Sequence, residues 1–292
     1  MVALALQQAP FAGYTQTALA SVRILRSDTV LEDVPVLYRP GAVFVLQGSK
    51  QGFLGGNVYR YDADRYLTVS VPVPFRMASQ ASPEKPLLAV YVDFDLRLAA
   101  EIAVTLEASR LDIAAAPARS LVSSPMEPAI ADVVRRLLQA LADPAEIAVL
   151  GAALLRELHY RVLIGPQGKA LAATLKQRGP TGKIIRSLAT IRTRFAEGIS
   201  VPDLAASAGM SVPSYYAHFK ALTGSTPIQY VKSIRLHEAR LMLAQKQGPI
   251  AAVAAEVGYA SPAQFSREFK RHFGRNPTEE ARWMRQHLGE LA

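Results

Sequence analysis

The sequence predicts an α+β protein in which a sandwich or small barrel of β-strands with trailing helices is followed by an all-helical part. Two observations support this fold class. From about Ala18 to Leu106 the apolar pattern has a period of two, and β-branched and aromatic side chains are frequent. Later, a pattern of short helix, glycine turn and second short helix occurs twice, in residues 206–227 and 255–277. A repeat of this length indicates a duplicated structural unit.

Length and composition are typical of a folded protein. The 292 residues are enough for two domains, and 50% of them are apolar while 20% are charged. The sequence contains no cysteine, which rules out disulfides and thiolate metal sites. The first residues, MVALALQQAPFAGY, lack the basic stretch of a signal peptide, and no apolar run approaches the roughly 20 residues that span a bilayer. We therefore expect a cytoplasmic protein with no membrane contact and no cofactor.

Short strands at close spacing fill the N-terminal part. They are expected at Val34–Tyr38, Ala42–Gln47, Val58–Tyr61, Tyr66–Val73 and Leu87–Phe94. Turn residues separate them, among them Pro-Gly after the first strand and Asp-Ala-Asp before the fourth. Several short strands with such punctuation favour a sandwich or a small barrel.

Helical patterns follow the strands. A first helix is expected up to about Leu106, and the segment Ala114–Pro128, rich in Ala, Ser and Pro, is expected to be a loop. Apolar residues then recur along Ile130–Leu141 and Ile147–Leu158 at the spacing of one helical face, with Asp143 as a candidate N-cap between them. These two helices could cap the strands, or one of them could pair with a second copy of the chain.

Glycine and proline residues mark a boundary after these helices. The segments GPQG and RGPTG flank a short predicted helix at about Lys169–Lys176. The resulting division is a first domain at 1–165, a linker at 166–182, and a second domain at 183–292 with helix-turn-helix units at about 199–220 and 249–271.

The two units share their landmarks. Gly209 and Gly258 are 49 residues apart, whereas Phe219 and Phe269 are 50 apart, so the second turn holds one extra residue, at Ala260. The glycines supply the left-handed conformation of each turn.

A longer helix, from Pro227 to about Lys246, joins the two units. Thr226 is its candidate N-cap, and Gly248-Pro249 ends it. About 20 residues at a rise of 1.5 Å give a length near 30 Å. Successive major grooves of B-DNA lie about 34 Å apart, so one chain could occupy two adjacent grooves.

The second domain is strongly basic. Residues 183–292 hold 15 Lys and Arg against 8 Asp and Glu, whereas residues 1–182 hold 18 against 16. Charge concentrated in the segment that carries the repeat favours a polyanionic partner over a merely solvated surface. A helix, a tight turn and a second helix in a basic segment are typical of a DNA-binding protein.

The outward faces of the second helices would meet the DNA. Gln264 could hydrogen-bond an adenine edge, and Arg267 suits guanine. Phosphates would be neutralised by basic side chains and by the capped helix N-termini. The candidates for phosphate contact are Ser211, Lys220, Lys232, Arg235, Ser261, Lys270 and Arg271.

Many positions of the two repeats and the joining helix follow one motif with constant spacing. They are Gly209, Ser211, Phe219, Gly224, Pro227, Tyr230, Arg235, Ala239, Leu243, Gly258, Tyr259, Ser261, Phe265, Phe269, Phe273, Gly274 and Pro277. Over about Ile184–Arg285 this motif resembles the AraC/XylS family of bacterial transcription regulators. The resemblance implies two helix-turn-helix subdomains that bind promoter DNA and usually activate transcription by RNA polymerase.

The resemblance also implies which residues read bases. They are Pro213, Tyr216, Ala217, Ala263, Gln264 and Arg267, with Ser214 as a further candidate. Pro213 and Ala217 can offer only apolar contact, for instance to a thymine methyl group. The second unit should therefore supply more of the direct readout, unless Ser214 or His218 contributes.

The first domain carries a motif of its own. It includes PVLY-x-P, then Gln47-Gly48 with Lys50, and later E-x-x-Y-R-x-L-x-GPQG. Over about Val34–Gly168 it resembles the N-terminal domain of one AraC subgroup, a cupin-like β-barrel followed by helices. The resemblance implies a role in sensing an effector, in dimerisation, or in both.

A small organic effector would be held by apolar walls with a few polar groups. The candidates are Tyr38, Tyr59, Tyr61, Tyr66, Arg76 and Tyr91. All five histidines lie outside the strand region, so the barrel lacks the histidine ligand set of a catalytic cupin. The sequence also contains no P-loop, GxGxxG or GxSxG motif. We therefore predict neither a metal nor a catalytic residue.

Together these observations predict a sequence-specific DNA-binding regulator, most simply an activator, whose N-terminal barrel senses a small organic effector. Its partners would be double-stranded promoter DNA, RNA polymerase, the effector and, as a candidate, a second copy of the chain. Effector binding would change how the helices of Ile130–Val162 or the linker present the second domain. Two alternatives stay open: a metal-free barrel enzyme with a DNA-binding tail, and a sequence-neutral DNA-organising protein.

Overall fold

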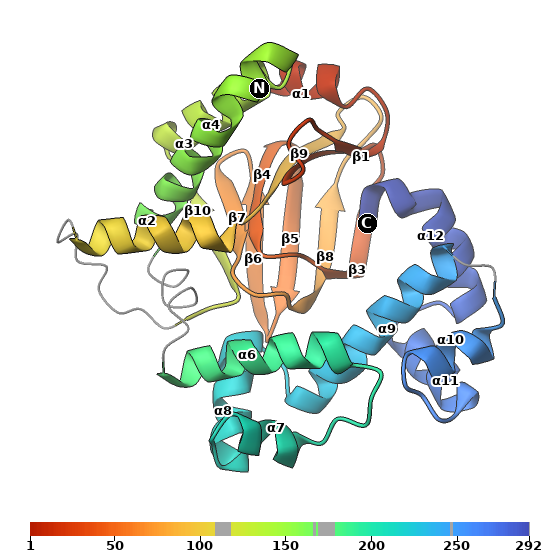
Figure 1. Ribbon diagram of the computed structural model, residues 1–292. Helices are drawn as coiled ribbons and strands as arrows, with labels where there is room; N and C mark the ends of the chain where they lie inside the picture. The colour runs from red at the N-terminus through yellow and green to blue at the C-terminus, as the bar shows by residue number, and fades with distance from the viewer. Residues whose placement is uncertain (109–117, 166–167, 169–178, 246–247, 292) are drawn as a thin grey trace.

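A curved antiparallel sheet lies at the centre of the protein, with helices against one of its faces and the C-terminal helices along its other side (Figure 1). The computed structural model describes residues 1–108, 118–165, 168, 179–245 and 248–291. The helix expected at Lys169–Lys176 lies outside the described residues.

Ten strands form this sheet in the described part of the chain. They are β1 (Gly13–Gln16), β2 (Val22–Ser27), β3 (Leu31–Leu37), β4 (Gly41–Gln47), β5 (Ser49–Leu54), β6 (Asn57–Asp62), β7 (Arg65–Val69), β8 (Pro74–Gln80), β9 (Leu87–Asp93) and β10 (Leu121–Pro125). Their order is β1-β2-β9-β4-β7-β6-β5-β8-β3, and β10 pairs with β7. The result is an open half-barrel, which confirms the predicted N-terminal fold class.

Strand β10 corrects one expectation. The segment Ala114–Pro128 is expected to be a loop, yet Leu121–Pro125 pairs in antiparallel register with Arg65–Val69. A composition of Ala, Ser and Pro does not favour a strand. The unpaired edge of β7 nevertheless provides hydrogen-bonding groups that this segment satisfies, and pairing of that kind depends on residues more than 50 positions away.

The convex face of the sheet packs against four helices. They are α1 (Val2–Gln8), α2 (Leu96–Ala108), α3 (Pro128–Ala140) and α4 (Pro144–Ile164). Phe44 and Val90 of the sheet share a core with Val134 and Leu158 of α3 and α4. Asp143 caps α4, since its carboxylate accepts hydrogen bonds from the amides of Ala145 and Glu146. Both helices therefore cover the sheet, as the first of the two interpretations expects.

In the C-terminal part, the residues that the structure describes form helices and no strands. They are α6 (Gly179–Arg194), α7 (Val201–Ser207), α8 (Val212–Thr223), α9 (Pro227–Gln245), α10 (Ile250–Glu256), α11 (Pro262–Phe273) and α12 (Pro277–Leu291). Helices α7 and α8 form the first helix-turn-helix unit, and α10 and α11 form the second. α7 and α10 begin 49 residues apart, whereas α8 and α11 begin 50 apart, as the repeat predicts.

The concave face of the half-barrel and the first unit share one hydrophobic core. Val43 and Tyr61 of the sheet belong to the same buried cluster as Ile184 of α6, Tyr215 of α8 and Tyr230 of α9. The second unit has a separate cluster around Phe265 and Phe269. Residues before and after the predicted linker at 166–182 therefore contribute to one buried core.

Candidate DNA interface and effector pocket

The first helix-turn-helix unit is built by local capping and a small core. Ser211 caps α8, with its hydroxyl accepting from the amide of Ser214 at 3.4 Å. Gly209 makes the turn at φ 58°, a conformation that favours glycine. Tyr215 and Phe219 are fully buried beneath the helix. On its other side Pro213, Ala217, His218 and Lys220 are exposed, whereas Ser214 and Tyr216 are half-buried.

The second unit repeats this construction. The hydroxyl of Ser261 accepts from the amide of Gln264 at 3.3 Å and caps α11. Gly258 turns at φ 87°, and a Cβ there would lie 2.3 Å from the carbonyl oxygen of Ala196, so the turn packs directly on the α6–α7 loop. The side chains presented outward by α11 are Ala263, Gln264, Arg267, Lys270 and Arg271.

Glu268, in the middle of α11, accepts hydrogen bonds from three polar side chains. Its carboxylate accepts from Lys232 at 2.8 Å, from Gln264 at 3.3 Å and from the Tyr259 hydroxyl at 2.9 Å. Burial alone would raise the pKa of Glu268, but these hydrogen bonds outweigh it and lower the pKa. Arg267, by contrast, has no hydrogen bond or ion pair to any described residue, so its guanidinium is available to a ligand.

Arg235 has a structural role that the sequence does not reveal. Although phosphate contact is expected for it, its guanidinium donates to the carbonyl oxygens of Phe195 at 2.7 Å, Glu197 at 2.7 Å and Gly258 at 2.9 Å. These bonds join α9 to the α6–α7 loop and to the turn of the second unit. We therefore leave Arg235 out of the proposed DNA interface.

Helix α9 also attaches the DNA-binding part to the half-barrel. The Tyr230 hydroxyl donates to the carbonyl oxygen of Pro72 at 2.7 Å, and Arg240 donates to that of Pro35 at 2.9 Å. Arg240 is 5% exposed and forms a 2.7 Å ion pair with Glu280 of α12, which is 1% exposed. The ion pair joins α9 to α12, and the hydrogen bond from the same guanidinium to Pro35 fixes α9 against the half-barrel.

The half-barrel touches the C-terminal ends of both outward-facing helices. Arg76 of β8 pairs with Asp33 and donates to the carbonyl oxygen of His272 in α11 at 3.1 Å. At the other unit, Leu54 lies against Gly224, the residue that ends α8. The sheet therefore holds both units from behind and leaves the outward faces of α8 and α11 uncovered (Figure 1).

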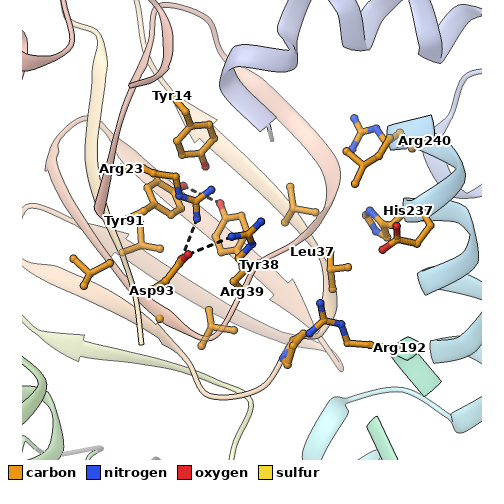
Figure 2. A pocket seen from close by; sticks show the side chains of 18 of the residues that line it. Tyr14, Arg23, Leu37, Tyr38, Arg39, Tyr91, Asp93, Arg192, His237 and Arg240 are labelled. Atoms are coloured by element: carbon orange, nitrogen blue, oxygen red, sulfur yellow. Dashed lines mark hydrogen bonds and ion pairs between the residues drawn. The ribbon is translucent and has the colours of Figure 1, made fainter. Parts of the chain in front are cut away.

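Between the sheet and α9 lies a cavity of about 340 Å³, which we call the interdomain cavity. Figure 2 shows its polar lining: tyrosines and arginines of the half-barrel face Arg192, His237 and Arg240 of the helices. Asp93 pairs with Arg23 at 3.0 Å and with Arg39 at 3.6 Å. The apolar part of the lining includes Val36, Leu37, Val43, Val69, Leu241 and Met284.

A buried cluster of tyrosines and one lysine lies behind the half-barrel wall of this cavity. The ammonium of Lys50, which is 1% exposed, donates to the hydroxyl of Tyr91 at 2.8 Å. The Tyr38 hydroxyl lies 3.2 Å from that of Tyr91 and 3.5 Å from that of Tyr61. Burial raises the pKa of Tyr61 and Tyr91 well above the ordinary value. For Tyr38 the charge of Lys50 and the surrounding hydrogen bonds outweigh burial and lower the pKa.

The structure brings together three of the six predicted pocket residues. Tyr38 and Tyr91 line the interdomain cavity, and Tyr61 lies directly behind them. Tyr66 is on the convex face, stacked on Phe44, and so does not reach the cavity. The remaining two, Tyr59 and Arg76, lie at other contacts between the sheet and the helices.

Sequence reasoning named Lys50 only as part of the N-terminal motif, and it missed the helical half of the cavity lining. Lys50 occupies a buried position of β5 next to the exposed Gln51, and a lone lysine on the inward face of a strand is the signal that could have indicated its role. His237 and Arg240 follow the periodicity of α9, so the sequence alone shows only that they share a helix. His237 is 6% exposed, its Nε2 has no hydrogen-bond partner, and burial lowers its pKa well below the ordinary value.

Two further properties concern the described residues only. None of their helices is both long and apolar enough to cross a membrane. They also contain no group of three or more His, Cys, Asp or Glu side chains placed to hold a metal ion.

A half-barrel joined to tandem helix-turn-helix units defines a class of protein: a DNA-binding regulator with an attached sensor domain. Residues 18–170 match the AraC-type transcriptional regulator N-terminus, and residues 204–282 match a helix-turn-helix domain. The first match alone covers more than half of the chain. The chain belongs to the AraC-type transcriptional regulators.

Curated relatives match the C-terminal part. The probable transcriptional regulator LumQ of Photobacterium leiognathi is 38% identical over 88 residues, which are 30% of this chain and 36% of LumQ. The transcriptional activator RclR of Escherichia coli is 36% identical over 87 residues, which are 30% of this chain and 31% of RclR. The match thus spans about a third of the length of each relative.

A solved structure matches almost the whole chain. The structure of ToxT from Vibrio cholerae, described as bound to an unsaturated fatty acid, superposes with a TM-score of 0.63 at 13% identity. The superposition covers 93% of this chain and 97% of ToxT. At this identity the likeness establishes the shared fold.

Proposed function

We propose that this regulator binds specific promoter DNA through α8 and α11 and that a small organic molecule controls it from the interdomain cavity. The observation that carries the proposal is the lining of the cavity. It comes both from the half-barrel and from α9, the helix that joins the two helix-turn-helix units. A ligand there contacts the sensor and the DNA-binding part at once. That ToxT, a protein of this fold, is described with a bound fatty acid supports a ligand-binding role.

The proposed base-reading residues differ between the two units. In the first they are Pro213, Ser214, Tyr216 and Ala217, which offer mainly apolar contact. In the second they are Ala263, Gln264 and Arg267. Arg267 is exposed and has no hydrogen bond or ion pair within the described part of the chain, which supports direct readout of guanine by the second unit.

Phosphate contacts are proposed for the exposed or capping residues around these helices. They are Ser211, Lys220, Lys232, Ser261, Lys270 and Arg271. Lys232 already pairs with Glu268, so its contribution would come from the edge of the interface. Helix α9 has 19 residues and is therefore about 28 Å long, which suits two units that enter adjacent major grooves about 34 Å apart.

The mechanism differs from the one expected from the sequence. The helices of Ile130–Val162 lie on the convex face, away from the DNA-binding part, whereas α9 contacts the concave side directly. Ligand binding would therefore act on the contact between the sheet and α9, and so on the relative placement of the two units. We propose that the protein activates transcription through RNA polymerase rather than repressing it, since relatives such as RclR are named activators.

Homodimerisation is proposed for the surface formed by α2 and α4. Val104 is 67% exposed, Val149 is 78% exposed and Leu150 is 42% exposed. Analytical ultracentrifugation of the wild type and of Val149→Glu tests this. A wild-type monomer at micromolar concentration would contradict the proposal.

The main experiment selects genomic fragments with the full-length protein and compares their binding with random DNA of equal length. Strong preference for the selected fragments supports the proposal. A reporter driven by a promoter from these fragments should also change its expression when the gene for this protein is introduced. Salt-sensitive binding without preference would favour a DNA-organising protein. Substrate turnover by the half-barrel would favour the enzyme alternative. Because a bacterial promoter lies in the cytoplasm, we also propose that this protein is cytoplasmic.

A further inference from the structure

We propose that Glu268 determines which base Gln264 reads: its carboxylate fixes the Gln264 amide so that α11 selects adenine and rejects guanine. This inference deepens the proposed function, because it rests on the reading of DNA by α8 and α11. It follows from the hydrogen bonds around Glu268 and from the groups that each base exposes in the major groove.

Side chains from different elements hold Glu268 in place. Lys232 of α9 donates to its Oε1 at 2.8 Å, and Tyr259, in the turn between α10 and α11, donates to its Oε2 at 2.9 Å. Gln264 of α11 donates to Oε1 at 3.3 Å. The Glu268 side chain is only 12% exposed. A carboxylate that is bonded from several sides has one orientation, unlike a glutamate on a solvated helix face.

The same contacts keep Glu268 ionised. Burial acts to raise the pKa of this carboxyl, but the hydrogen bonds from Lys232, Gln264 and Tyr259 outweigh burial and lower the pKa. An ionised carboxylate accepts hydrogen bonds and donates none. Only the nitrogen of the Gln264 amide can therefore face Glu268, and the amide oxygen is directed away from it.

The fixed amide presents one acceptor and one donor to a ligand. One N–H group of Gln264 Nε2 is bonded to Glu268, which leaves the other N–H group and the oxygen Oε1. Gln264 is exposed, and these remaining groups have no hydrogen-bond partner among the described residues. Adenine exposes an acceptor, N7, and a donor, the N6 amino group, in the major groove. Adenine therefore matches both groups of the fixed amide.

Guanine does not match the fixed amide. Its N7 and O6 are both acceptors. A freely rotating glutamine could turn both of its N–H groups toward them, but Glu268 already binds one. The Gln264 oxygen would then face guanine O6, and an acceptor left without a donor in a closed interface costs free energy. Glu268 thus removes the guanine-binding arrangement of Gln264, whereas Arg267, with no carboxylate partner in the described chain, stays suited to guanine.

Single-base changes in a selected DNA site test this assignment. Gel shifts with the full-length protein compare every base at each position, and Gln264→Ala identifies the position that Gln264 reads. Glu268→Gln keeps the shape of the side chain but can also donate, so it no longer fixes the amide. It should lower the adenine-over-guanine preference at that position about tenfold. The position that Arg267→Ala affects should keep its preference in Glu268→Gln.

Two further variants accompany this comparison. Glu197→Gln is the matched control, because it removes the same charge from an exposed pair with Arg194 on the α6–α7 loop and should leave the base preference unchanged. Lys232→Met removes the cation that holds Glu268 without changing α11, and should lower the same preference in part. An undiminished adenine-over-guanine preference in Glu268→Gln would overturn the proposal, and so would a Gln264→Ala variant that changes the preference at no position.

Nuclear magnetic resonance measures the fixed amide without DNA. One Nε2 proton of Gln264 should lie further downfield in the wild type than in Glu268→Gln, and the spectrum of Gln264→Ala assigns the signals. Identical signals in the two proteins would overturn the role of Glu268 alone. A wild type that prefers no DNA fragment would instead overturn the regulator function, and the amide signals would still decide whether Glu268 orients Gln264.

Discussion

Arg240→Met is expected to destabilise the protein strongly, because it leaves Glu280 buried without its closest charge partner. The two side chains form a 2.7 Å ion pair at 5% and 1% exposure. Removing one member of a buried pair costs about 3–5 kcal/mol. Arg275 remains 3.2 Å from Glu280 and partly compensates, which favours the lower end of that range. The lost bond to the Pro35 carbonyl adds about 1 kcal/mol. We therefore expect a loss of about 4 kcal/mol.

Urea unfolding measures this loss. The sequence contains a single tryptophan, Trp283, whose ring lies 5.5 Å from the Arg240 guanidinium, so its fluorescence reports on this site. Circular dichroism on the same samples reports on the whole chain. Arg194→Met is the matched control: its 2.7 Å pair with Glu197 is mostly exposed and should be worth less than about 1 kcal/mol.

A double variant separates the buried charge from simple loss of packing. Arg240→Met combined with Glu280→Leu removes both charges and should recover most of the lost stability, since apolar replacements of buried ion pairs are often nearly neutral. If Arg240→Met cost no more than the Arg194→Met control, or if the double variant were as unstable as the single one, the reasoning would be refuted.

Three further predictions concern the second helix-turn-helix unit. Arg267→Ala should cost about 1–3 kcal/mol on a selected site and relax preference at one base pair, and equal losses on selected and random DNA in gel shifts would contradict this. Ser261→Ala should cost about 1 kcal/mol in thermal unfolding through the lost helix cap, with Ser266→Ala as a control within α11. Burial and neighbouring arginines lower the pKa of His272 to about 4, so the unfolded chain takes up this proton first as the pH falls. Between about pH 6.5 and 4 the wild type should therefore lose roughly 3 kcal/mol relative to His272→Gln, and parallel pH profiles would sink this prediction.

The helix-turn-helix units show what can be deduced along the chain. Gly209 and Gly258 turn in the left-handed region, as the sequence predicts, and Ser211 and Ser261 cap the helices that follow. A cap or a turn depends on residues within about four positions, so the information lies within each short segment. The strands were predictable only as a class, because the alternation that marks them does not specify which strands pair.

The sequence by itself therefore determined the family, the α+β class and the tandem DNA-binding units. The tertiary structure decided where a ligand could bind and which basic residues are free. Lys50 and Tyr91 are 41 residues apart, and Arg240 and the Pro35 carbonyl are 205 apart. Such contacts depend on how the half-barrel curves and where α9 lies across it. Local periodicity and spacing do not encode that geometry, since many sheets and helices with the same patterns would place these side chains elsewhere.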